Sequence, residues 1–102
     1  MKILIKLIKK GIAMQIIKLA TAGTMESSDA YVEVEPLTSG VEIEIQSVVY
    51  QQFGDSIRQS VLDVINEEGV TSVRVRIVDR GALDPVIRAR VRTAIRRGGD
   101  TV

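Results

Sequence analysis

Three segments of the chain alternate between apolar and polar residues. Residues 31–36 and 41–46 alternate valine or isoleucine mainly with glutamate, and residues 72–78 alternate them with arginine. This period of two is typical of strands with one buried face. Because Pro36 and Gly40 lie between the first two segments, we expect those two to pair as a hairpin. Opposite charges across a strand pair are stabilising, so we expect the arginine strand beside at least one acidic strand.

Two other segments repeat their apolar residues at helical spacing. The first predicts a helix over residues 57–67, with Asp55 or Ser56 as the N-cap and Gly69 ending it. The second predicts a helix that Asp84 caps and that Pro85 opens as the first helical residue. Its inward positions are Ile87, Val91, Ala94 and Ile95, and Gly98-Gly99 ends it.

The predicted order is β-β-α-β-α, with a further short strand at 15–19. It indicates an α+β fold, a two-layer sandwich in which two helices cover one face of a small antiparallel or mixed sheet of three to four strands. We expect one domain over residues 14–97, a leader or extension at 1–13 that is disordered, and a flexible tail at 98–102.

Lysines interrupt the apolar residues of the leader. Its apolar runs are too short for a membrane span or for the core of a secretory signal. We therefore expect a cytoplasmic protein that does not associate with membranes. The alternative is a basic amphipathic segment lying on a membrane surface.

The composition excludes several functions. The chain has no Cys, His or Trp and only three aromatic residues. It therefore cannot form a disulfide framework or supply a thiol of its own, and it lacks the commonest general base and metal ligand. We expect no catalytic residue and no metal site in this chain.

Charge is segregated along the sequence although the net charge is only +1. Residues 1–22 carry five lysines and no acid, residues 23–69 carry ten acids and one arginine, and residues 70–102 carry eight arginines. Arg88, Arg92 and Arg96, with Arg90 and Arg97, line the second helix. This arginine stripe predicts a solvated face or a docking surface for an acidic partner; the alternative is contact with phosphates of nucleic acid or of a prosthetic arm.

One loop carries candidate chemistry. Ser27 and Ser28 lie between Glu26 and Asp29, immediately before the first alternating strand. Two adjacent hydroxyls could be nucleophiles, but no His or Cys is present to activate them. Taken by itself, the pattern favours an ordinary polar turn.

Four segments together resemble the acyl carrier protein (gamma subunit) family of citrate lyase, from about residue 14 to residue 97. They are Ala22-Gly-Thr-Met-Glu-Ser-Ser-Asp29, Gln52-Phe-Gly-Asp55, Asp79-Arg-Gly-Ala-Leu-Asp84 and Ile87-Arg-Ala-Arg90. The resemblance implies that Ser27 carries a covalent 2'-(5''-phosphoribosyl)-3'-dephospho-CoA group through a phosphodiester. We expect Glu26, Ser28 and Asp29 to shape the loop that the modifying transferase recognises, and Ser28 stands where the family also accepts Gly.

The resemblance further implies a carrier that performs no bond change itself. The alpha subunit of citrate lyase exchanges acetyl for citryl on the arm, and the beta subunit cleaves the citryl thioester to oxaloacetate and acetyl thioester. These subunits and the prosthetic-group transferase are the expected partners, with no nucleic acid. A chain without a thiol needs such an arm for acyl chemistry, because the arm supplies the sulfur and the tether keeps the acyl group near partner sites.

Three alternatives stay open on sequence alone. The chain could be the carrier of a related complex, citramalate lyase or malonate decarboxylase. It could be a phosphopantetheine carrier loaded at Ser56, because Gly54-Asp-Ser-Ile57 imitates the attachment loop of those all-helical proteins. It could also be a non-catalytic module that binds nucleic acid or an acidic protein through its arginine-rich helix.

Overall fold

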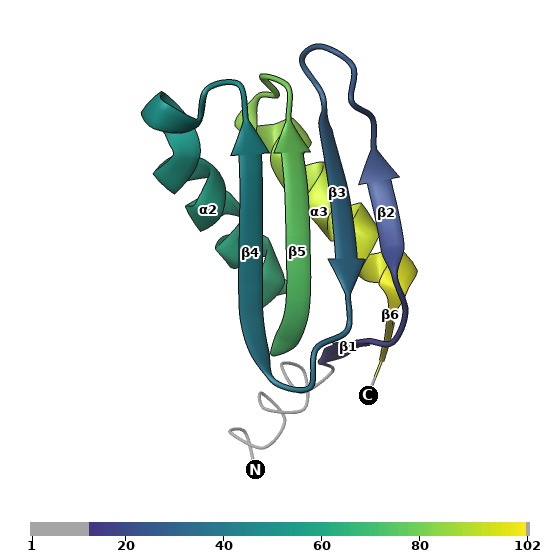
Figure 1. Ribbon diagram of the computed structural model, residues 1–102. Coiled ribbons are helices and arrows are strands. Elements are labelled where there is room, and N and C mark those ends of the chain that lie inside the picture. The colour runs from purple at the N-terminus through teal and green to yellow at the C-terminus, as the bar shows by residue number, and fades with distance from the viewer. Residues whose placement is uncertain (1–12, 102) are drawn as a thin grey trace, which may run out of the picture.

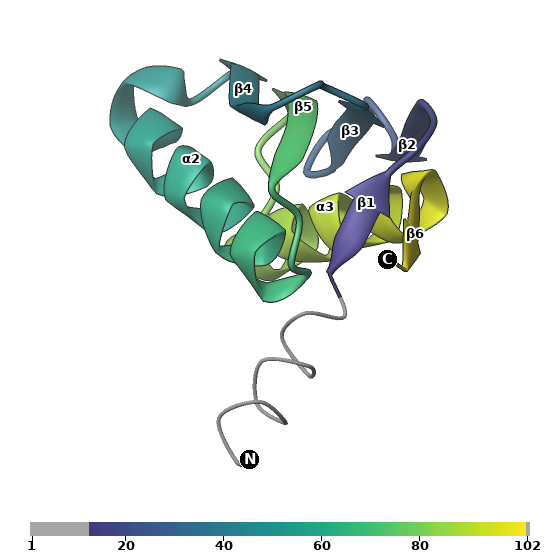
Figure 2. The same cartoon turned by 90° about the horizontal axis from the view of Figure 1, so that it is seen from below.

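The computed structural model describes residues 13–101, which form two layers. A four-stranded sheet is covered on one face by two helices, and a second, two-stranded sheet lies at one end (Figures 1 and 2). The elements in chain order are β1 (Met14–Ile16), β2 (Ala20–Gly23), β3 (Ala30–Glu35), β4 (Gly40–Ser47), α2 (Tyr50–Glu67), β5 (Ser72–Asp79), α3 (Asp84–Gly98) and β6 (Gly99–Thr101). The predicted α+β fold class, with two helices on one face of a small mixed sheet, is confirmed.

The strand order of the main sheet is β2-β3-β5-β4. The pairs β2–β3 and β3–β5 are antiparallel, whereas β4 and β5 run parallel. The predicted hairpin between residues 31–36 and 41–46 is therefore wrong, because β5 lies between β3 and β4. The connection at residues 36–39 passes across the end of β5 instead of closing a tight turn.

Charge explains why β5 separates the two acidic strands. In a direct hairpin the outward glutamates of β3 and β4 would lie on one face of adjacent strands, and like charges there are destabilising. With β5 in the middle, Arg74 lies between Glu35 and Glu42, at 2.7 and 3.1 Å from their carboxylates. Arg76 contacts Glu33 of β3 at 3.1 Å and lies opposite Glu44 of β4 in the register. The expectation that β5 lies beside an acidic strand is confirmed on both of its sides.

The core lies between the sheet and the helices. Its central side chains come from the inward positions of β3 and β5 and from one face of each helix, with α3 packed under β2 and β3 and α2 beside β4 (Figure 2). The fully buried members include Val32, Val34, Val61, Val64, Ile65, Val73, Val75, Ile77, Val91, Ala94 and Ile95. The predicted inward stripes of β3, β5 and α3 are confirmed.

Helix α2 begins at Tyr50, well before the predicted start at Ile57. Asp55 and Ser56 lie inside the helix, so the predicted N-cap is wrong. The helix starts earlier because Val49, Phe53 and Ile57 keep the helical spacing, and the Val49 N–H is already satisfied by the Ser47 hydroxyl at 3.1 Å.

The other end of α2 is as predicted. Gly69 follows the last turn with a positive φ of 72°. Its N–H bonds to the Asn66 carbonyl, and the Val70 N–H bonds to the Ile65 carbonyl, both at 3.1 Å. These two bonds form a Schellman motif, which satisfies carbonyls that the end of the helix would leave unpaired.

Helix α3 begins one residue earlier than predicted, at Asp84, so Pro85 is its second residue. The Asp84 carboxylate makes no capping bond to the helix backbone, which corrects its predicted role. It accepts hydrogen bonds from Ser60 of α2 and from Arg88 one turn later. The acid is still favourable there, because the first turn of a helix has a partial positive charge.

The two ends of the described chain meet in the small sheet. Residues 98–101, expected within a flexible tail, instead end α3 and form β6, which pairs antiparallel with β1. Of the segment 15–19, expected as one short strand, only residues 15–16 lie in a strand, β1, and residues 17–19 connect β1 to β2. The expected leader lies outside the described residues apart from Ala13. No helix within residues 13–101 has the length and hydropathy that crossing a bilayer requires.

Candidate functional site

Ser27 lies in the loop between β2 and β3, residues 24–29, called here the Ser27 loop. Its side chain is exposed. The loop projects from the end of the sheet where β4 and β5 also finish, so the connections from β4 to α2 and from β5 to α3 lie at the same end (Figure 1). The structure therefore presents the Ser27 hydroxyl at one tip of the molecule.

Asp29 fixes the base of the Ser27 loop. Its carboxylate accepts hydrogen bonds from the Thr24 hydroxyl at 2.7 Å, from the Thr24 N–H at 3.1 Å and from the Ala30 N–H at 2.7 Å. It also accepts a bidentate pair from Arg90 of α3, with Nε at 2.9 Å and Nη2 at 3.0 Å. Paired N–H donors of this kind hold a carboxylate in both position and orientation.

These contacts change the acidity of Asp29. Hydrogen bonds from Arg90 first, and then from Thr24 and Ala30, hold the pKa of the carboxyl well below its usual range, although burial opposes the shift. The carboxyl is thus charged at neutral pH, and its charge is matched by Arg90 inside the fold. Asp29 therefore anchors the loop and is not available as a proton donor to Ser27.

The tip of the loop is a tight turn. The Asp29 N–H bonds to the Glu26 carbonyl at 3.1 Å, and Ser28 has a positive φ of 66°. Such backbone favours Gly, which gives a physical reason for the expectation that this position also accepts Gly. Arg80 closes the turn against the end of β5, since its backbone carbonyl and N–H pair with Ser28 and Asp29, both at 2.9 Å.

Arg80 also places a positive charge beside the loop. Its Nη1 donates to the Met25 carbonyl at 3.1 Å, two residues before Ser27. Arg80 takes no part in the ion pairs that join arginines to carboxylates within residues 13–101. Its charge is therefore not neutralised by a carboxylate of the described fold.

The four predicted loop residues differ in their surroundings. Glu26, Ser27 and Ser28 are exposed on the turn, while Asp29 is half-buried beneath it.

Sequence reasoning missed the roles of Arg80 and Arg90. The signal for Arg90 was available, because it lies two residues from Arg88 and Arg92 and so points to another side of the helix than the stripe at 88, 92 and 96.

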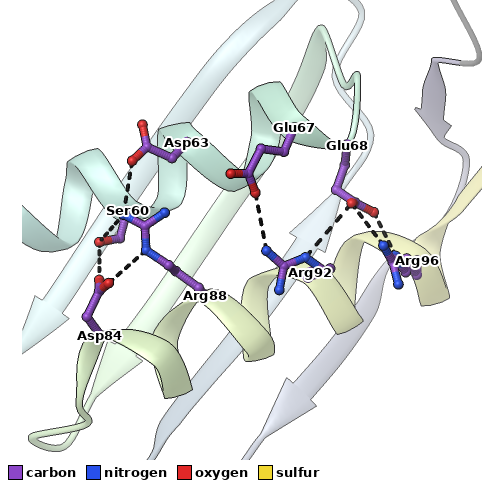
Figure 3. A network of polar contacts seen from close by, with 8 residues as sticks. All are labelled: Ser60, Asp63, Glu67, Glu68, Asp84, Arg88, Arg92 and Arg96. Atoms are coloured by element: carbon purple, nitrogen blue, oxygen red, sulfur yellow. Dashed lines mark hydrogen bonds and ion pairs between the residues drawn. The ribbon is translucent and has the colours of Figure 1, made fainter. Parts of the chain in front are cut away.

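Most of the predicted arginine stripe is paired within the molecule. Arg88 contacts Asp63 at 3.0 Å and Asp84 at 2.7 Å, and Arg92 and Arg96 contact the acidic residues at the end of α2 (Figure 3). This face therefore joins the two helices and also remains in contact with solvent, since the Arg96 side chain is 61% exposed; docking of an acidic partner stays a prediction. Internal carboxylates also compete with any nucleic acid for these arginines.

Ser56 does not lie in a loop. It is an exposed residue within α2, and the domain contains a sheet. Both facts differ from the all-helical phosphopantetheine carriers that Gly54-Asp-Ser-Ile57 imitates.

An apolar pocket of about 410 Å³ opens beside the end of β5. Its walls come from the start of α2 and from the connection between β5 and α3. Buried Asp79 forms part of its lining and holds the two adjoining connections in place, because its carboxylate accepts bonds from the Ser47 hydroxyl at 2.7 Å and the Ala82 N–H at 2.9 Å. The lining residues are Val49, Phe53, Ser56, Ile57, Asp79, Gly81, Ala82, Leu83, Asp84 and Ile87.

The substitution Asp29→Asn tests whether the charge of Asp29 stabilises the loop, through the pH dependence of the free energy of unfolding. We expect it to lower the free energy of unfolding at pH 7 by about 2 kcal/mol, because hydrogen bonds to a charged group are lost or weakened. A depressed pKa stabilises the fold above the unfolded value, which is 3.8 here, and the contribution is lost as the pH falls below it. The difference between wild type and variant, measured by urea unfolding, should therefore shrink as the pH falls below about 4. An equal difference across this range would show that the charge of Asp29 is not what stabilises the loop.

A family model and the similar sequences both describe acyl carrier proteins. A family model of acyl carrier proteins, described as malonate decarboxylase delta subunit (MdcD), matches residues 17–98. The citrate lyase acyl carrier protein of Weissella paramesenteroides is 47% identical over 89 residues, which cover 87% of this chain and 92% of that protein. The protein of the same name from Haemophilus influenzae (strain PittEE) is 48% identical over 87 residues, covering 85% and 90%.

Among solved structures, a chain of a Pseudomonas malonate decarboxylase hetero-tetramer in complex with malonate has the same fold. The TM-score is 0.68 over 83% of this chain and 89% of that one, at 22% sequence identity. A structure from Thermus thermophilus gives a TM-score of 0.62 at 9% identity, although the match covers only 17% of that chain. At these identities the likeness concerns the fold alone.

Proposed function

Because this chain belongs to the citrate lyase acyl carrier protein family, we propose that Ser27 carries 2'-(5''-phosphoribosyl)-3'-dephospho-CoA through a phosphodiester. The chain is a non-catalytic acyl carrier subunit of a multi-subunit lyase, which confirms the expected family and role. Acyl carriage by a chain with no Cys implies a covalently attached prosthetic group. The identity of that group and its attachment at Ser27 are our proposal.

The observation that supports Ser27 is the construction of its loop. The hydroxyl is exposed at the tip, while Asp29 and Arg90 fix the base and Arg80 fixes the side. A transferase therefore meets a primary hydroxyl in one defined backbone geometry rather than on a mobile segment. The hydrogen bonds that hold the loop involve the neighbours of Ser27, so its oxygen can be modified without breaking them.

The charges of the site fit a phosphodiester. Arg80 lies against the loop with no carboxylate partner among residues 13–101, and a guanidinium is a preferred partner of phosphate oxygens. Ser27 would hold the group covalently, and Arg80 would neutralise its first phosphate. When bound, the group supplies a terminal thiol that carries acetyl or citryl as a thioester during cleavage of citrate to acetate and oxaloacetate.

In this proposal the chain binds the prosthetic group, orients it and presents it to the partner subunits. We propose the acyl-transferase (alpha) and acyl-lyase (beta) subunits of citrate lyase and the prosthetic-group transferase as its partners, and the cytoplasm as its location. The rigid loop base holds the attachment point of the arm fixed, and tethering maintains a high local concentration of acyl group at the partner sites. The alternative of a malonate decarboxylase carrier is supported by the description of the matching family model and by the shared fold, whereas the relatives at 47–48% identity are citrate lyase acyl carrier proteins; citramalate lyase stays an untested alternative.

Intact-mass measurement tests this proposal. Chain produced together with the transferase and its activated precursor should gain the mass of the whole prosthetic group, far more than one phosphate. Peptide mapping should then place the added mass on the peptide containing Ser27. An unchanged mass, or a modification mapped to Ser56, would refute the proposal.

A further inference from the structure

The apolar pocket lies close to the Ser27 loop. The Ser28 N–H bonds to the Arg80 carbonyl at 2.9 Å, and Gly81, the next residue along the chain, lines the pocket. Asp79, on the other side of Arg80, lines it as well. Residues 79–81 at the end of β5 therefore contact both the Ser27 loop and the pocket.

The pocket offers an aromatic face and apolar walls that nothing in residues 13–101 covers. Phe53 is 55% exposed and Leu83 is 75% exposed, although both are large apolar side chains. Deeper in the lining, Ile57 and Ile87 are buried. A mostly apolar hollow of this size with few polar groups is typical of small-molecule sites.

The polar groups of the pocket define which ligand fits. They include two carboxylates: that of Asp79 is buried and already accepts from Ser47 and Ala82, whereas the side chain of Asp84 is 55% exposed and is paired with Arg88. A flat, uncharged heterocycle with an exocyclic amine can stack on Phe53 and donate to the Asp84 carboxylate, the more exposed of the two. Purine rings of the adenine type meet these conditions, and base–aromatic stacking is favourable for every base.

We propose that this pocket holds the adenine ring of the prosthetic group attached at Ser27. The inference rests on the proposed function, since it takes the attachment and the identity of the group from there. Arg80 lies between the loop and the pocket and would pair with the phosphate end of the arm, while the apolar pocket receives the uncharged ring. A weak, open pocket is sufficient, because a tethered ligand has an effective concentration on the order of millimolar.

Methyl NMR on the loaded chain tests this proposal. Nuclear Overhauser effects are expected between the adenine H2 and H8 protons and the methyl groups of Ile57, Leu83 and Ile87. Intact mass is measured on the same sample, so failure of loading is seen separately from failure of the pocket. Effects confined to Met25, or a ring that tumbles freely in a fully loaded sample, would overturn the inference.

Free adenosine tests the pocket without the arm. Titrated into the unmodified chain, it should shift the same methyl signals, and Phe53→Ala should weaken this binding about fivefold or more, as expected when a base loses one stacking partner. Leu19→Ala is the matched control, because Leu19 is 60% exposed but precedes β2 at the opposite end of that strand from the Ser27 loop. Equal binding by the Phe53 variant and the wild type would overturn the inference.

The partner subunits provide the remaining comparison. If the pocket methyl groups of the loaded chain change only when the alpha or beta subunit is added, the pocket is a protein-docking surface and the inference is wrong. If they are already shifted in the isolated loaded chain, the ring occupies the pocket before any partner binds, as we infer.

Discussion

Replacing Ser27 by alanine is expected to abolish attachment of the prosthetic group completely. The substitution removes the oxygen that would form the phosphodiester, and no other group can replace it in the same geometry. The fold should be unaffected, within about 0.5 kcal/mol, because the side chain is exposed and the bonds that hold the loop come from its neighbours. Intact mass after incubation with the transferase measures the loss, and urea unfolding measures the stability.

Ser28→Ala is the matched control for this prediction. Ser28 is an adjacent exposed hydroxyl on the same turn, so a requirement for any hydroxyl in the loop would be met by either residue. We expect Ser28→Ala to remain loadable and Ser56→Ala to behave as the wild type. Full loading of Ser27→Ala, or loss of loading only in Ser56→Ala, would contradict the assignment.

The sequence predicts which segments form helices and strands better than it predicts which strands are adjacent in the sheet. Alternation identified β3, β4 and β5, because burial of one face leaves a period of two in the sequence. The hairpin prediction failed because it relied on the proximity of β3 and β4 in the chain and on the Pro-Gly connection. The charges predict the observed order better. When the arginine strand lies between the two acidic strands, Arg74 and Arg76 each lie between glutamates of both neighbours.

The candidate site, too, could be predicted from the sequence only in part. The resemblance predicts Ser27 and its loop from local motifs, but the residues that hold the loop in the structure come from distant parts of the chain. Arg90 lies 61 residues from Asp29, and Arg80 reaches the loop only because β5 pairs with β3. Such contacts depend on tertiary structure, and propensity or spacing within one segment does not report them. The same reason explains the failed cap at Asp84, whose carboxylate is engaged by Ser60 of α2.

Gly23→Ala is expected to disrupt the Ser27 loop more than any other small substitution near it. Gly23 ends β2 with a φ of +87°, which costs an alanine about 1–2 kcal/mol. A Cβ there would also lie 1.8 Å from the Ala30 carbonyl oxygen and 3.0 Å from Cδ of Arg90. Because the first of these atoms is backbone, the start of β3 must move, and the bonds that Asp29 makes to Thr24 and Arg90 must distort with it. We expect a loss of about 3 kcal/mol or more in the free energy of unfolding, together with slower loading of Ser27.

Gly40→Ala separates the steric part of this effect from the backbone part. Gly40 has a similar φ of +79°, but an added Cβ there has no atom within 4 Å, and the residue begins β4 at the other end of the sheet. We expect this variant to lose only the about 1–2 kcal/mol of left-handed strain and to load at the wild-type rate. Urea unfolding and timed mass spectra of both variants give the comparison. If the two substitutions cost the same and load equally fast, close packing of Gly23 against Ala30 does not shape the site, and the loop reaches its geometry without that contact.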